Sequence, residues 1–230
     1  MPILELITSS GLGSLLGMRH ALEPDHLAAV STLVTGEKSG VKAAWLGACW
    51  GMGHTCALVA AGTVLVGLRA EMPAAAADAF EMAVALMLVG LGLRAMYLAA
   101  RYGDDGPAYA HHHDRLVHVH PGAPAHVHIG RWTLARRPLL IGAVHGLAGS
   151  GALTALVLAT LPSTAARLTY MALFGLGSTA GMATLSGVLG WPIGRLARHE
   201  TVARFISLTV GCMSTVLGVL WGYPLVGKLL

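Results

Sequence analysis

Five ionisable residues stand within eight positions near the start of the chain, in the string Arg19-His20-Ala21-Leu22-Glu23-Pro24-Asp25-His26, between apolar stretches of membrane length. Each charge at bilayer depth costs at least about 2.5–3.5 kcal/mol, so such a cluster is typical of a functional site that lines a polar cavity. Imidazole and carboxylate together suit a borderline transition-metal ion better than a hard ion such as calcium. We therefore expect His20, Asp25 and His26 to be metal ligands. The alternative is an ordinary short loop with its charges at the membrane surface.

The spacing of these three residues does not suit a straight helix. At about 100° per residue, Asp25 and His26 would lie about 140° and 120° from His20, on opposite sides, and could not share one small ion. Pro24 lacks an N–H group and its ring opposes a continuing helix, so the carbonyl of His20 loses its usual partner. Irregular backbone is tolerated at membrane depth where it lines a polar cavity. The sequence therefore predicts a helix break at or near Pro24, with the three side chains and freed carbonyls around one ion.

Two more histidines lie within apolar segments. His54 stands in Gly51-Met52-Gly53-His54-Thr55, where the glycines allow another backbone to approach closely. We expect His54 to be a ligand or a proton carrier, and the alternative is a hydrogen-bonded core residue. His145, in His145-Gly146-Leu147-Ala148-Gly149-Ser150-Gly151, is the less certain candidate, because a structural or gating role competes with ligation.

A polar segment, residues 102–133, is rich in histidine. It contains His111, His112, His113, His118, His120, His126 and His128. So dense a tract usually indicates metal binding. The stretch 117–128 alternates about Pro121-Gly122-Ala123-Pro124 as a hairpin would, and a hairpin with His120 opposite His126 and His118 opposite His128 would place four imidazoles on one face. The alternative is a solvated linker, since an isolated hairpin is marginal in water.

The composition indicates a membrane protein. Of the 230 residues, 55% are hydrophobic and 11% are charged, whereas a soluble domain carries about 25% charged residues. Apolar runs of about 18 or more residues are typical of membrane helices. We expect an all-α integral membrane protein with about six transmembrane helices, at about 3–34, 41–68, 79–101, 137–160, 166–190 and 202–224. The first segment lacks a basic leader and exceeds signal-peptide length, so it is expected to be retained.

The two halves of the chain resemble each other at an offset near 124–125 residues. Gly51-Met52-Gly53-His54-Thr55 corresponds to Gly175-Leu176-Gly177-Ser178-Thr179, and the stretch ending at His20 corresponds to the one ending at His145. Three helices per half would make the second copy enter the membrane from the opposite side, as in the inverted repeats of many transporters. We expect three parts: a repeat at 1–101, a His-rich loop at 102–133 and a second repeat at 134–230. Chance similarity of Gly- and Ala-rich helices is the alternative.

The basic residues predict the orientation. The first, third and fifth connections hold Lys38, Lys42, Arg101, Arg115, Arg131, Arg136, Arg137, Arg195, Arg198 and Arg204, against Arg69, Arg167 and Lys228 on the other side. Because cytoplasmic loops carry the excess of Lys and Arg, we expect the His-rich loop to be cytoplasmic and both termini to be outside the inner (plasma) membrane. The net charge of +4 then reflects these loops rather than nucleic-acid binding. The three cysteines lie in apolar stretches without a CxxC pair, so no disulfide framework is implied.

These motifs resemble those of the nickel/cobalt transporter family. His20-x4-Asp25-His26 resembles its HX4DH signature, Gly53-His54-Thr55 its LGHS motif, and Leu173-Phe174-Gly175-Leu176-Gly177 the start of its LGFDTATE motif. The match then departs, because residues 178–182 carry no Asp or Glu. The short length resembles the branch of urease accessory permeases. The resemblance implies recognition of nickel or cobalt by His20, Asp25 and His26, and by His54 with more caution.

We therefore expect a permease for a divalent transition metal and not an enzyme. The expected substrate is nickel or cobalt, with zinc as an alternative, and no permanently bound cofactor. Uptake is the leading direction and efflux the runner-up. Expected partners are the lipid bilayer and, on the cytoplasmic side, a metallochaperone or urease maturation proteins. A different class, a membrane redox protein with haem between His20, His54 and His145, is the competing hypothesis.

Overall fold

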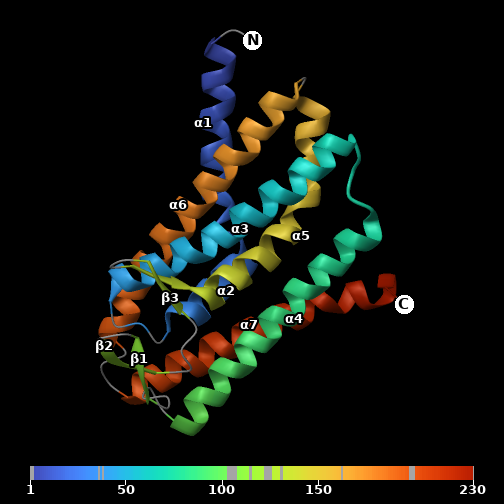
Figure 1. Cartoon of the computed structure of the whole chain (residues 1–230). Coiled ribbons are helices and arrows are strands. Elements are labelled where there is room, and N and C mark those ends of the chain that lie inside the picture. The colour runs from blue at the N-terminus through green and yellow to red at the C-terminus, as the bar shows by residue number, and fades with distance from the viewer. Residues whose placement is uncertain are drawn as a thin grey trace.

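The computed structural model describes residues 3–35, 37, 39–102, 108–113, 116–121, 126–129, 132–161, 163–196 and 200–229. Helices occupy all six predicted apolar segments. They are α1 (Ile3–His20), α2 (Pro24–Val34), α3 (Gly40–Leu68), α4 (Ala74–Tyr102), α5 (Arg136–Thr160), α6 (Thr164–Leu196) and α7 (Glu200–Leu229). The first predicted segment is divided between α1 and α2, and each of the others is one helix (Figure 1).

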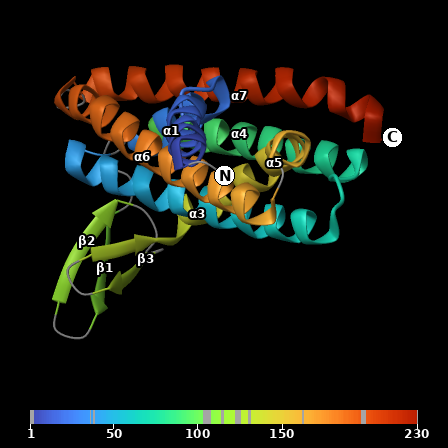
Figure 2. The same cartoon turned by 90° about the horizontal axis from the view of Figure 1, so that it is seen from above.

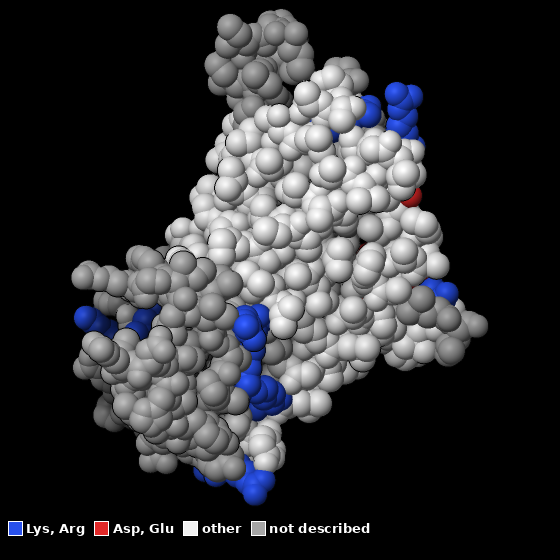
Figure 3. Space-filling model, in the orientation of Figure 1, with Lys and Arg blue, Asp and Glu red and all other residues white. Residues whose placement is uncertain are grey.

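Several of these helices are long and apolar enough to cross a membrane. Among the described residues four qualify, namely Gly40–Leu68, Ala74–Arg101, Thr164–Leu196 and Thr201–Lys228. Helix α5 bends by 43° between Arg136–Gly149 and Gly151–Val157, and it is a fifth span if the bent pair counts as one. Figure 3 shows a broad surface with few charged residues, with Lys and Arg gathered mainly toward one end. The chain is therefore a multi-pass membrane protein.

The short helix α2 lies at the centre of the bundle. It contacts α3, α4, α6 and α7, while α1 packs on α6, α3 packs on both α5 and α6, and α4 packs on α7 (Figures 1 and 2). Ala29, Val30 and Val34 of α2 are buried in one cluster with Trp50 and Leu88. The start of α2, which carries Asp25 and His26, is thereby held in the interior.

Glycines bring α5 unusually close to α3. A Cβ atom added at Gly142 would overlap the carbonyl oxygen of Trp50, and one added at Gly146 would overlap that of His54. Small residues are the usual means by which membrane helices approach at short range. The two glycines therefore position His145, which lies between them on α5, against the part of α3 that carries His54.

Four short strands stand off one end of the bundle, between α4 and α5 (Figure 2). Strand β1 (Ala108–His113) pairs antiparallel with β2 (Leu116–Pro121), and β3 (His126–Ile129) pairs antiparallel with β4 (Trp132–Ala135). His118 is thus opposite His111, and His128 is opposite Thr133. The predicted hairpin between 118–120 and 126–128 is wrong. The connection of two residues in each observed hairpin is the length that such turns favour, whereas β2 and β3 are four residues apart.

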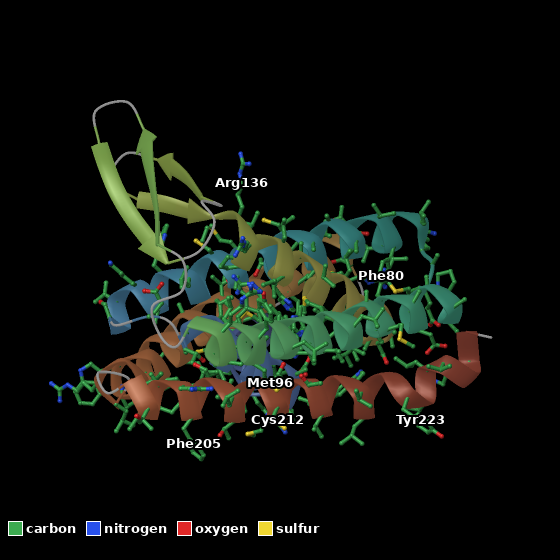
Figure 4. The ribbon with its side chains drawn as sticks, turned by 90° about the horizontal axis from the view of Figure 1, so that it is seen from below. Phe80, Met96, Arg136, Phe205, Cys212 and Tyr223 are labelled. Carbon is green, nitrogen blue, oxygen red and sulfur yellow. The ribbon has the colours of Figure 1, made fainter. Side chains whose placement is uncertain are left out.

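The outer face of α7 is apolar. Phe205 and Tyr223 are 70% and 80% exposed, and with Cys212 they point away from the rest of the bundle (Figure 4). A large exposed apolar surface of this kind is typical of contact with membrane lipid. Cys49 is buried, whereas Cys56 and Cys212 are exposed.

Candidate metal centre

The predicted break at Pro24 is confirmed. Helix α1 ends at His20 and α2 begins at Pro24, after a turn at residues 21–23. Pro24 occupies the first position of α2, where a missing N–H group costs nothing because that group has no helical partner. The prediction of a free His20 carbonyl is wrong, since this oxygen accepts the backbone N–H of Glu23 at 3.1 Å.

The turn brings three histidines of three helices together. The ring centroid of His20 (α1) lies 4.4 Å from that of His26 (α2) and 5.3 Å from that of His54 (α3), and the rings of His26 and His54 are 5.5 Å apart. One ring nitrogen of each lies within 4.8 Å of the others, close enough to hold one metal ion. His54 is fully buried, and the side chain of His20 is 16% exposed. We call His20, His26 and His54 the three-histidine group.

A second group shares His26. The Asp25 carboxylate contacts Nδ1 of His26 through Oδ1 at 3.0 Å and Nε2 of His145 through Oδ2 at 3.4 Å. These atoms also lie within 4.8 Å of one another, and all three residues are buried. His145 belongs to α5, so residues far apart in the sequence complete this set. We call Asp25, His26 and His145 the carboxylate group.

Most of the imidazole nitrogens have no hydrogen-bond partner. Within the described residues this holds for Nε2 of His20, Nε2 of His26, both ring nitrogens of His54 and Nδ1 of His145, while Nε2 of His145 makes only the 3.4 Å contact with Asp25. A buried polar atom without a partner costs about 1–3 kcal/mol. Figure 4 shows nitrogen atoms gathered in the interior of the bundle. Imidazole nitrogens with one carboxylate form a donor set that fits nickel, cobalt or zinc.

Carboxylates orient two of the histidines. Nδ1 of His20 lies 3.0 Å from Oε1 of Glu23. Nδ1 of His26 lies at the same distance, 3.0 Å, from Oδ1 of Asp25. Metal-ligating histidines usually donate the other ring N–H to a carboxylate, which fixes the ring and leaves the free nitrogen for the metal. Glu23 was not among the predicted ligands. Its position three residues after His20, immediately before the proline that begins α2, was the available signal for this role.

Two aromatic side chains cover the histidines. Trp50 lies 5.4 Å from His26 and 5.6 Å from His145, and Phe174 of α6 lies 5.4 Å from His20, between ring centroids. An apolar shell of this kind limits access of water to the donor atoms. Sequence reasoning missed both residues. The position of Trp50 one helical turn before His54 is a signal for the first residue, and Phe174 lies within the Leu173–Gly177 motif without any feature that indicates contact with His20.

The loop histidines belong to a separate part of the molecule. His118 and His120 lie on β2, and His126 and His128 lie on β3, whereas α1, α2, α3 and α5 carry the buried groups. Only the strand pairing of the loop histidines is described, and their side chains fall outside the described part of the chain.

Fold and site together define a multi-pass membrane protein with imidazole and carboxylate donors enclosed at its centre. The family model of the high-affinity nickel-transport proteins, NicO, matches residues 6–220. The chain therefore belongs to this nickel-transport family.

Two relatives extend the comparison. The chain is 32% identical over 226 residues to the urease accessory protein UreH of Bacillus sp. (strain TB-90), covering 98% of this chain and 95% of that one. It is 30% identical over 190 residues to the chloroplast protein FOR GROWTH AND FERTILITY 1 of Arabidopsis thaliana, covering 80% of this chain and about half of the relative. No solved structure matches.

Proposed function

We propose that the protein is a permease that carries Ni²⁺ through the buried groups formed by His20, Asp25, His26, His54 and His145. The observation that carries this proposal is the set of buried imidazole nitrogens without hydrogen-bond partners, gathered inside a bundle whose helices α3, α4, α6 and α7 are long and apolar enough to cross a membrane. Co²⁺ is proposed as a second substrate and Zn²⁺ as a weaker one, because the donor set suits all three. The close packing of the histidine rings, 4.4–5.5 Å between centroids in the three-histidine group, argues against a haem held between them.

Uptake is the proposed direction. A divalent cation moving inward gains about 4.6 kcal/mol per 100 mV, twice the value for a single charge. The proposed location is the inner (plasma) membrane, with both termini outside and the 102–133 loop cytoplasmic, as the distribution of basic residues indicates. Efflux is the competing direction, with the loop loading the ion instead of receiving it.

An inverted repeat, with parts at 1–101 and 134–230, accounts for how the helices pack. Gly17 of α1 lies against the carbonyl of Phe174 on α6, and at the corresponding positions Gly142 of α5 lies against the carbonyl of Trp50 on α3. Likewise Gly177 lies against Ser14, and Gly53 lies against Leu139. Each contact between the first and second half is therefore matched by a contact between the corresponding residues of the second and first half. This supports six membrane spans in two related sets of three, in which the broken α1–α2 pair is the first span.

The His-rich loop is proposed to collect metal on the cytoplasmic side. The name of the UreH relative suggests that the ion is passed to a metallochaperone or to urease maturation proteins. Replacing His118, His120, His126 and His128 together with alanine should alter loading at low metal concentration without ending transport, because these residues lie outside the membrane helices.

The test is metal movement across vesicles of known orientation, with Ni²⁺, Co²⁺ and Zn²⁺ in competition. His20→Ala, Asp25→Ala and His26→Ala should each abolish transport while the protein keeps its melting temperature within a few degrees. Cys56→Ser is the matched control, because this exposed thiol stands two residues from His54 on another face of α3. Nickel transport by His20→Ala at the wild-type rate would refute the proposed site, and net export alone would reverse the direction.

A further inference from the structure

The two donor groups meet in one residue, His26. The three-histidine group and the carboxylate group each bring three ligand atoms within 4.8 Å of one another, and His26 belongs to both. Its Nδ1 atom lies 3.0 Å from the Asp25 carboxylate. The other ring nitrogen, Nε2, is buried and has no hydrogen-bond partner, so it is the atom available to bind an ion together with His20 and His54. The two nitrogen atoms of this one imidazole ring therefore belong to two different sets of ligands.

The carboxylate group has the dimensions of a coordination shell. Two ligand atoms that are each about 2.1 Å from an ion are about 3.0 Å apart at an octahedral angle and about 3.4 Å apart at a tetrahedral one. Asp25 lies 3.0 Å from Nδ1 of His26 through Oδ1 and 3.4 Å from Nε2 of His145 through Oδ2, so each nitrogen faces its own carboxylate oxygen. One ligand atom from each of the three residues lies within 4.8 Å of the others, which brings the set within reach of one ion.

The two groups differ in burial and in charge. The three-histidine group borders the surface through His20, 16% exposed, and through Glu23, whose side chain is 54% exposed. In the carboxylate group the side chains of Asp25, His26 and His145 are 10%, 2% and 1% exposed. The first group has three neutral imidazoles as donors, whereas the second has a negative carboxylate. A cation that enters beside Glu23 is thus attracted toward Asp25.

Resting on the proposed function, we propose that the two groups are alternative positions of one transported ion. The outer position consists of three imidazole nitrogens, from His20, His26 and His54. The inner position consists of two nitrogens and a carboxylate oxygen, from His26, His145 and Asp25. His26 passes the ion from one position to the other. Two divalent ions so close together would repel strongly, so the two positions are occupied in turn.

Binding of Co²⁺ to the purified full-length protein tests this inference, because its visible absorption reports the number and type of ligands. The loop histidines at 111–113, 118, 120, 126 and 128 are replaced with alanine in every sample, so that only the buried groups contribute. His54→Gln removes a ligand of the outer position only, and His145→Gln removes one of the inner position only. Each variant should bind one Co²⁺ per chain with a different spectrum, while Ni²⁺ transport in vesicles falls at least tenfold. His26→Gln and the double variant should bind at least tenfold more weakly than either single variant. Cys56→Ser should match the wild type.

Three outcomes separate the possibilities. Identical spectra and equal losses of affinity in His54→Gln and His145→Gln would indicate one composite site and overturn the inference. Two Co²⁺ ions bound at once per chain, in a protein whose buried groups are intact and whose loop histidines are replaced with alanine, would also overturn it. A wild-type protein that neither binds nor transports Ni²⁺ would instead refute the proposed function itself.

Discussion

The hydroxyl groups of Thr55 and Thr179 lie 2.8 Å apart although the residues are separated by 124 positions in the sequence. In the proposed repeat, each is the counterpart of the other. A residue that touches its own counterpart must lie on or next to the axis that relates the halves. Gly51 lies against Thr179, and its counterpart Gly175 lies against Thr55, so the same glycine–threonine contact occurs on both sides of the two hydroxyl groups. The α3–α6 contact is therefore the centre of the proposed repeat.

Removing either hydroxyl should weaken this contact. Thr55→Val and Thr179→Val keep the side-chain shape, and each should lower the free energy of unfolding by about 0.5–1.5 kcal/mol. The double variant should lose less than the sum, because the two groups share one hydrogen bond. Denaturant unfolding in detergent measures the cycle. Additive losses would show that the hydroxyls do not act as a pair, although Thr55 would still donate to the carbonyl of Gly175.

Glycine substitutions should separate tight helix contacts from open helix surface. In Gly146→Ala the new methyl group overlaps the carbonyl of His54, and overpacking of this kind costs about 1–3 kcal/mol. In Gly90→Ala the methyl group meets nothing within 4 Å, and alanine should stabilise the helix by about 0.5–1 kcal/mol. Melting temperatures in one detergent should therefore move in opposite directions. Equal shifts would contradict the close α3–α5 contact.

Most helices could be predicted from the hydrophobic runs, and the break between α1 and α2 could be predicted from Pro24. The predicted positions of helices required only that apolar stretches of membrane length form helices. The approach of His145 to Asp25 could not be predicted, because the predicted repeat relates His145 to His20 but does not show which side chain His145 meets in the other half. The covering by Trp50 and Phe174 depends on the rotation of α3 and α6 about their axes, which the pattern of mainly apolar helices leaves undetermined.

The loop shows a different limit. Alternation of histidine with other residues is compatible with more than one register, and a strand pairs with whichever partner closes the shorter turn. The pairing of β2 with β1 therefore replaced the predicted pairing with β3 without any change in the residues that alternate.

The proposed orientation predicts which connections are reached from each side of the membrane. In a background without native cysteines, Ser39→Cys between α2 and α3 should react with a membrane-impermeant thiol reagent only from the cytoplasmic side. Ser163→Cys between α5 and α6 should react only from outside. Mass-tag labelling of intact cells and of inverted vesicles measures both. Labelling of Ser163→Cys from the cytoplasmic side alone would invert the assignment.

Glu23 should act as a positioning residue for His20. Its carboxylate accepts the N–H of His20 Nδ1 at 3.0 Å, so that Nε2 is presented to the three-histidine group. Loss of an outer-shell partner of this kind typically lowers metal affinity about 10–100-fold. Glu23→Ala should therefore weaken Ni²⁺ binding by about this factor and reduce transport at low nickel concentration. Glu23→Gln should restore much of the affinity, because its side-chain carbonyl still accepts the N–H.

Glu71→Ala is the matched control for Glu23, since Glu71 is also an exposed glutamate and lies in the connection between α3 and α4. Titration calorimetry with Ni²⁺ measures affinity, and the Co²⁺ spectrum reports whether His20 is still a ligand. Glu23→Ala should shift this spectrum at full occupancy, whereas a merely attractive surface charge would change affinity and leave the spectrum as it is. Equal affinity losses in Glu23→Ala and Glu71→Ala would reject the positioning role, because the effect would then follow charge alone and not the contact with His20.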